Sequence, residues 1–199
     1  MLLTSRSPRR RQLLVQHAID FLAEHPGVED SILEPGTATP EGWVAALAYL
    51  KSRAGLEVFA SNLRPGDILL GADTACVMGG RLFGTPRDAD EARAIIRGFS
   101  GRVHDVVTGV TILDPFTMER RLLVDRATVR MGRLSDAQID EYIAGGQWAG
   151  KAGAYNLEER VAAGWPIEVA GDPTTVVGLP MRLLLRELDR RARLAQTPA

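Results

Sequence analysis

Apolar residues recur along this chain at two different spacings, which predict strands and helices in alternation. A period of two runs through residues 102–113 and 119–130 and is typical of strands, and shorter apolar stretches bounded by turn residues indicate further strands. The glycines at 79 and 80 mark a hairpin turn. The predicted strands are residues 1–4, 67–78, 81–83, 102–113, 119–130 and 165–169.

Apolar stripes at helical spacing follow several helix-start signals. The first stripe extends from Leu13 to Leu22, and the second predicted helix covers residues 39–54. Because helices and strands alternate throughout, we expect an α/β fold, and the length favours a single domain over residues 1–199. The start signals are Ser7-Pro8, Pro40, the capping pairs Asp88/Glu91 and Ser135/Gln138, and Pro180.

Composition excludes several classes of protein. The chain is 45% hydrophobic and 25% charged, as soluble globular domains are, and no apolar run approaches the ~20 residues that span a bilayer. We expect no signal peptide and no membrane partner. The net charge of −1 argues against a nucleic-acid binder, and a single cysteine, Cys76, fits a reducing cytoplasm.

Lysine is rare in this chain. Lys and Arg total 24, but lysine occurs only at Lys51 and Lys151, so 24 − 2 = 22 of them are arginine. A lysine kept in such a chain indicates a site that needs a compact ammonium group rather than a planar guanidinium. Lys51 flanks the apolar stripe of its predicted helix, where a buried ammonium requires a nearby anion. Chance and a solvent-directed side chain are the alternatives.

Two stretches place charge where it is unexpected. Asp73 interrupts the apolar run "ILLGADTACVM", where a carboxylate costs several kcal/mol unless a cation, a donor or water meets it. The stretch "SRSPRRR" at residues 5–11 crowds arginines at a helix start, where free N–H groups and the helix dipole favour phosphate. A structural turn at Asp73 and a solvated basic helix end are the simpler explanations.

Three other features do not indicate chemistry. Residues 145–152, "GGQWAGKA", resemble a phosphate-binding P-loop, but Ala152 replaces the hydroxyl that holds Mg²⁺ and a helix precedes the loop. His104 has no His, Cys or Glu at metal-ligand spacing, so we interpret it as structural. Cys76 is interpreted as a buried small apolar residue.

Four blocks together resemble the Maf (septum-formation) family of nucleoside triphosphate pyrophosphatases. They are "TSRSPRRRQLL" (4–14), "LLGADTACVMGGRLFGTPRDADEA" (69–92), "FSGRVHDVVTGVTI" (99–112), and "GKAGAYNLEE" (150–159) with "VVGLP" (176–180). The resemblance covers essentially the whole chain. It implies an α/β fold with a mixed central sheet flanked by helices, in a Maf-like, ITPase-like architecture of two lobes with a cleft between them. It also implies a cytoplasmic homodimer.

The resemblance implies hydrolysis of a nucleoside triphosphate to the monophosphate and pyrophosphate with a divalent metal, Mg²⁺, Mn²⁺ or Co²⁺. Asp73 matches the family's catalytic carboxylate and is expected to bind the metal, with Glu34 as the choice for a second ligand. The residues expected to bind the substrate are Ser7, Arg9, Arg10, Lys51, Thr74, Lys151 and Glu158.

Two departures from the family pattern leave alternatives open. Thr85 stands where the family usually has lysine, so Lys151, Arg87 or Arg81 substitutes for that cation, or the protein binds nucleotides with weak or no turnover. Three positions resemble those that select the base in this family: Arg9, Thr74 and Glu158. The first two match the dTTP/UTP branch, and the third matches the 7-methyl-GTP branch.

Overall fold

The computed structural model describes residues 1–28 and 33–196. Within them, a mixed sheet of seven strands has the order β2-β1-β3-β5-β6-β7, with β4 paired to β3. β1 runs parallel to β2 and β3, and the other pairs are antiparallel. The strands are β1 Leu2–Thr4, β2 Leu22–Glu24, β3 Leu69–Met78, β4 Arg81–Phe83, β5 Arg102–Leu113, β6 Arg120–Met131 and β7 Ile167–Ala170.

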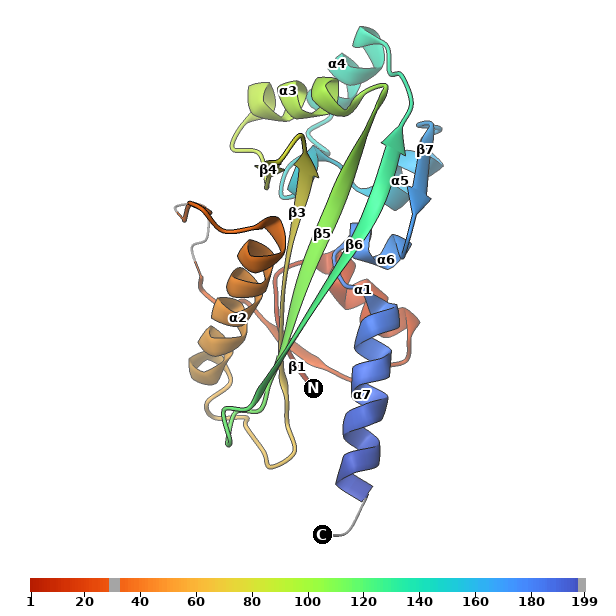
Figure 1. The fold of residues 1–199 in the computed structure, drawn as a ribbon. Helices are drawn as coiled ribbons and strands as arrows, with labels where there is room; N and C mark the ends of the chain where they lie inside the picture. Colours follow the sequence, from red (N-terminus) through yellow and green to blue (C-terminus); the bar gives the residue numbers. More distant parts are fainter. Residues whose placement is uncertain (29–32, 197–199) are drawn as a thin grey trace.

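Helices flank this sheet on both faces. Figure 1 shows the long strands β3, β5 and β6 as a twisted ribbon, with α2 on one side and α1 and α7 on the other. The helices are α1 Pro8–Gln16, α2 Pro40–Val58, α3 Ala89–Phe99, α4 Asp136–Ala144, α5 Leu157–Ala162, α6 Pro173–Val177 and α7 Met181–Gln196, with the short 3₁₀ helix η1 at Ala152–Ala154. The prediction of an α/β fold with a mixed sheet is confirmed. The cleft between two lobes stays a prediction.

Two glycines let α2 approach the sheet closely. A Cβ atom on Gly71 of β3 would lie 2.2 Å from the Ala48 carbonyl oxygen of α2, and one on Gly109 of β5 would lie 2.6 Å from the Val44 carbonyl. Because Gly71 and Gly109 have no side chains, the α2 backbone rests directly on the sheet. This contact sets how near the next turn of α2 lies to Asp73.

One edge of β3 is open in its middle. β1 pairs with β3 only at residues 69–70, and β4 pairs with it only at residues 76–78. Among the described residues, no strand pairs with residues 71–75 on that edge, while the other edge pairs with β5 throughout. Neighbouring residues of a strand point to opposite faces of its sheet. Asp73 and Thr74 therefore approach the same open edge from opposite faces.

Apolar clusters fill both faces of the sheet: two small clusters lie on the face covered by α2, and two larger clusters lie on the opposite face. One cluster joins α1, α6 and α7 to the face of β3 and β5 that carries Leu70 and Val110. A second packs α3 and α4 around Phe99 and Tyr155 at the other end of the sheet. Among the described residues, no helix combines the length and apolar character that a membrane crossing requires.

The structure corrects some predicted boundaries. The first helix ends at Gln16, Ala18 has a left-handed backbone (φ 52°), and Leu22 belongs to β2 and is exposed. Pairing with β1 therefore overrides the helical spacing. The second helix continues to Val58, and the short helices α5 and α6 were not predicted. The capping box at Ser135 is confirmed.

The capping pair at Asp88 is only half present. The Asp88 side chain accepts from the Glu91 backbone N–H at 2.8 Å, as predicted. The Glu91 carboxylate, however, accepts from the backbone N–H and the guanidinium of Arg87. A neighbouring cation thus draws this carboxylate away from the backbone N–H of the cap residue.

Candidate active site

A cavity of about 970 Å³ opens at the unpaired stretch of β3. Its walls come from the β1–α1 segment, from α2, from residues 149–159 and from the end of α6. The expected catalytic residue, Asp73, lines it, as do six of the seven residues expected to bind the substrate: Ser7, Arg9, Arg10, Lys51, Thr74 and Lys151. Segments far apart in the sequence therefore meet at one pocket.

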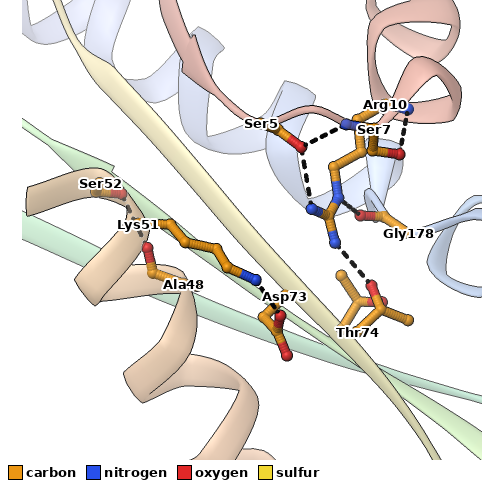
Figure 2. A network of polar contacts seen from close by, with 10 residues as sticks. Ser5, Ser7, Arg10, Ala48, Lys51, Ser52, Asp73, Thr74 and Gly178 are labelled. Atoms are coloured by element: carbon orange, nitrogen blue, oxygen red, sulfur yellow. Dashed lines mark hydrogen bonds and ion pairs between the residues drawn. The ribbon is translucent and has the colours of Figure 1, made fainter. Parts of the chain in front are cut away.

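Asp73 is paired with Lys51. The Lys51 ammonium on α2 lies 2.6 Å from a carboxylate oxygen of Asp73, and the two side chains are 13% and 12% exposed. Figure 2 shows the lysine reaching from its helix across to the strand. The sequence predicted a partner for each of these charges, and in the structure each is a partner of the other. Asp73 is thus a nearly buried carboxylate held at the wall of a cavity lined by cations.

Arg10 is held in place by three hydrogen bonds. Its guanidinium donates to the Gly178 carbonyl at 2.8 Å, to the Ser5 hydroxyl at 3.2 Å and to the Thr74 hydroxyl at 3.2 Å (Figure 2). The planar fork of arginine suits three acceptors that lie in different directions. Arg10 therefore joins the β1–α1 segment to β3 and to the end of α6, besides adding positive charge to the cavity.

The start of α1 forms part of the cavity wall, together with the residues that precede it from Thr4 onward. Ser7 caps the helix by accepting from the Arg10 N–H, and its own N–H donates to the Ser5 hydroxyl at 3.2 Å. Helix starts of this kind bind phosphate through N–H groups and the helix dipole. The basic helix start predicted from the sequence therefore faces the cavity.

Arg9 of α1 contacts the wall formed by residues 149–159, to which Lys151 belongs. Arg9 donates to the Gly150 carbonyl at 3.1 Å. Partial burial lowers the pKa of Arg9, and the negative charge of Glu159 acts against this shift. Lys151, only 8% exposed, forms an ion pair with Glu159.

Of the three cations proposed to substitute for lysine at position 85, Lys151 lines the cavity and the other two do not. The backbone N–H of Gly153 donates to the Gly84 carbonyl at 2.9 Å, which ties the segment of Thr85 to that of Lys151. Arg87 is 83% exposed and pairs with Glu91, while Arg81 stacks over Phe83. Lys151 is therefore the substitute that the geometry favours.

Two nominated residues do not line the cavity. Glu158 and Glu34 are both exposed and lie outside its lining. Glu159 lines the cavity instead of Glu158, because Asn156 caps α5 by accepting from the Glu159 N–H and so orients the first turn of the helix. The quoted block contains both glutamates, and only the cap at Asn156 could have distinguished them. Ser5 and Gly178 were also missed.

His104 and Cys76 are buried structural residues, as interpreted. His104 is 2% exposed, stacks on Phe99 and lies 2.9 Å from the Tyr155 hydroxyl. Burial lowers the pKa of His104 to about 4 and raises the pKa of Cys76 to about 12. The imidazole is therefore neutral and the thiol protonated near pH 7. The loop at 145–152 follows helix α4, which confirms that it is no P-loop.

The protein-family comparison matches residues 1–191 to the family described as Maf-like protein. The chain belongs to this Maf-like family. It is 39% identical to a protein of Anaeromyxobacter dehalogenans (strain 2CP-1) over 184 residues, 91% of this chain and 88% of that protein. It is 38% identical to a protein of Geobacillus sp. (strain WCH70) over 192 residues, 96% of this chain and 97% of that protein. Both relatives are named dTTP/UTP pyrophosphatase.

A third Maf-like relative, from Chromobacterium violaceum, has the same name and is 39% identical over 191 residues, 93% of this chain and 92% of that protein. The match to the Maf-like family includes every sequence block on which the resemblance was based.

Metal ligands from the protein are few at this site. Within the described part of the chain, no group of three or more His, Cys, Asp or Glu side chains gathers. Among the residues that the structure describes, Asp73 and Glu159 are the carboxylates that line the cavity. Mg²⁺ is commonly held by one or two carboxylates, substrate phosphates and water rather than by a cage of protein ligands. This donor set fits a cation that binds together with a phosphate substrate.

Proposed function

We propose that this protein hydrolyses dTTP or UTP to the monophosphate and pyrophosphate. The observation that carries the proposal is the Asp73 carboxylate, held by Lys51 at the wall of a cavity into which the start of α1 and further cations also face. A triphosphate needs such positive groups, because its reacting phosphorus is surrounded by negative oxygens. The names of the Maf-like relatives support the choice of dTTP and UTP.

In the proposed reaction, Asp73 accepts a proton from a water molecule whose oxygen attacks the α-phosphorus. The bond from the α-phosphorus to the oxygen that bridges it to the β-phosphorus breaks, and pyrophosphate leaves. Lys51 orients Asp73 through their ion pair. Both Lys51 and the N-terminus of α1 neutralise phosphate charge. Arg9 of α1 and Lys151 add further positive charge to the cavity wall.

We propose that Asp73 and phosphate oxygens of the substrate hold the divalent cation, Mg²⁺, Mn²⁺ or Co²⁺. When bound, such an ion lowers the pKa of a bound water and so supplies a stronger nucleophile near pH 7. The sequence-based choice of Glu34 as a second ligand stays a prediction, as do the substrate-binding roles of Ser7 and Glu158. We also keep the expectations of a cytoplasmic homodimer and no stable nucleic-acid partner.

Thr85 supports a second candidate function, which is nucleotide binding with weak or no turnover. It gives the cavity wall no charge where the family usually has lysine, and Lys151 beside it is already paired with Glu159. A protein of this kind would bind dTTP or UTP and respond to it without hydrolysing it at a useful rate.

The test is pyrophosphate release from a panel of nucleoside triphosphates with each of the three cations. We expect hydrolysis of dTTP and UTP, and a fall in kcat of roughly 10²–10⁴-fold in Asp73→Asn, the usual contribution of a positioned base. Asp90→Asn, at an exposed carboxylate of α3, is the matched control and should keep full activity. Tight binding of both nucleotides with no release of pyrophosphate would favour the second candidate.

A further inference from the structure

A row of hydroxyl groups crosses the sheet beside the cavity. Thr74 of β3 is the register partner of Thr108 on β5, and their hydroxyl oxygens are 2.9 Å apart. Thr108 in turn donates to the carbonyl oxygen of Thr175 on α6 at 2.8 Å. Thr108 and Thr175 are fully buried, whereas Thr74 is half-buried and lines the cavity. The row thus leads from the protein interior to the candidate active site.

Counting protons gives this row a direction. A carbonyl oxygen can only accept, so the single hydroxyl proton of Thr108 is committed to Thr175. Thr108 can then only accept from Thr74, whose own single proton is committed to Thr108. Arg10, which is always protonated, donates to the Thr74 oxygen from the other side.

The surrounding contacts hold this direction in place. The Thr175 hydroxyl donates to the carboxylate of Asp125 on β6, which fixes α6 over the sheet. Asp125 is the register partner of Thr108, so the anchor lies on the same rung as the hydroxyl row. The Thr175 carbonyl therefore stays aimed at Thr108.

Thr74 consequently offers the cavity a lone pair and no proton. Phosphate oxygens are acceptors, so an acceptor-only hydroxyl does not bind the triphosphate part of a nucleotide. A Cβ atom at position 178 would lie 3.3 Å from the Thr74 oxygen. Because position 178 is a glycine, no side chain covers this hydroxyl there. The group that meets Thr74 must be a hydrogen-bond donor of the nucleoside.

We propose that Thr108 is a specificity-positioning residue, which makes Thr74 an acceptor that selects nucleosides with a donor at this point. The inference rests on the proposed function, since it takes a nucleotide as the ligand. dTTP and UTP share two donors of this kind, the N3–H of the base and the 3′-hydroxyl of the sugar. Cytosine has an acceptor at N3 instead.

The test compares dissociation constants for UTP, CTP and 3′-deoxy-UTP, measured by calorimetry in EDTA so that no turnover is needed. In Thr108→Val, Thr74 loses its internal acceptor and can turn its proton toward the ligand. The Thr175 carbonyl still accepts from the Gly178 N–H at 3.2 Å in this variant. Thr108→Ser keeps the hydroxyl. Thr111→Val, on the same strand, removes a buried hydroxyl that has no partner and is the matched control.

We expect the wild type to bind UTP more tightly than the analogue that lacks the group donating to Thr74. Thr108→Val should reduce this ratio of dissociation constants about 3- to 10-fold, the net effect of one hydrogen bond. Thr108→Ser and Thr111→Val should keep the wild-type ratios. A change in the UTP:CTP ratio identifies the base as the donor, and a change in the UTP:3′-deoxy-UTP ratio identifies the sugar.

The proposal is overturned if Thr108→Val keeps both wild-type ratios while its melting temperature shows that it is folded. Absence of any preference in the wild type, or of UTP binding, overturns it equally. Pyrophosphate assays of the same proteins with metal separate the two proposals. A wild type that binds UTP with the expected ratios but releases no pyrophosphate refutes the proposed activity and leaves this inference standing.

Discussion

The ion pair between Lys51 and Asp73 predicts strong energetic coupling in the protein without substrate. Lys51→Met removes the ammonium but keeps a long side chain, and Asp73→Asn removes the carboxylate charge with little change of shape. These two variants and the double variant form a thermodynamic cycle that isolates the pairwise contribution.

The expected size follows from the geometry. At 2.6 Å and an effective dielectric constant of about 20, the gross attraction is about 6 kcal/mol. Desolvation of two side chains that are only about one-eighth exposed offsets much of it, since it costs several kcal/mol per ion. We therefore expect a coupling free energy of about 1–3 kcal/mol, and about 2–4 kcal/mol of destabilisation from Lys51→Met alone.

The assay is urea unfolding of the four proteins near pH 7.5 in EDTA, with free energies from linear extrapolation. If the substrate were the anion that Lys51 requires, as the sequence alone allows, removal of Lys51 would barely affect the protein without substrate. The structure instead pairs Lys51 with Asp73, so its removal should destabilise the apo protein. A coupling free energy below about 0.5 kcal/mol, the ordinary additivity error, would refute the reasoning.

Three further predictions concern other parts of the molecule. Burial lowers the pKa of His104 from 6.5 to about 4, so between these pH values the unfolded chain binds a proton that the folded protein does not. The contribution of the neutral imidazole to the free energy of unfolding is therefore complete above pH 6.5 and is lost as the pH falls toward 4. His104→Gln should remove up to about 3 kcal/mol of that acid-dependent fall in unfolding free energy, and an unchanged pH profile would contradict this. Gly153→Ala, whose Cβ would lie 2.3 Å from the Cys76 sulfur at φ +66°, should destabilise by about 2–4 kcal/mol in urea. Gly146→Ala, at φ +69° in open space, should cost only about 1 kcal/mol, and equal costs would contradict the packing argument. Thr85→Lys should raise kcat/KM for UTP roughly 10-fold or more through a charge-assisted contact, and no gain would exclude this position from phosphate binding.

Local patterns predicted most of the sheet, because short turns join β3 to β4 and β5 to β6, and because β5 and β6 carry the period-two pattern. Prediction failed where contacts distant in sequence decide the structure. Leu22 lies at helical spacing but pairs with Leu2 in a parallel ladder, which no local signal encodes. Helices α5 and α6 have six and five residues, too few for a helical period to appear.

The candidate site could be predicted where a charge contradicts its surroundings. Asp73 in an apolar run and Lys51 beside an apolar stripe were both nominated, and they form one ion pair. Ser5, Gly178 and Glu159 carry no such signal, because their place at the cavity depends on how the β1–α1 segment, α5 and α6 meet β3. The catalytic and binding roles assigned to these residues, and a single domain over residues 1–199, stay predictions.

The reaction itself is tested most directly by hydrolysing UTP in ¹⁸O-labelled water with Mg²⁺ and following the products by ³¹P NMR. Attack at the α-phosphorus predicts UMP that carries one ¹⁸O atom, together with unlabelled pyrophosphate. Asp73→Asn should give the same products far more slowly. Labelled pyrophosphate beside unlabelled UMP, or UDP with labelled orthophosphate, would contradict the account.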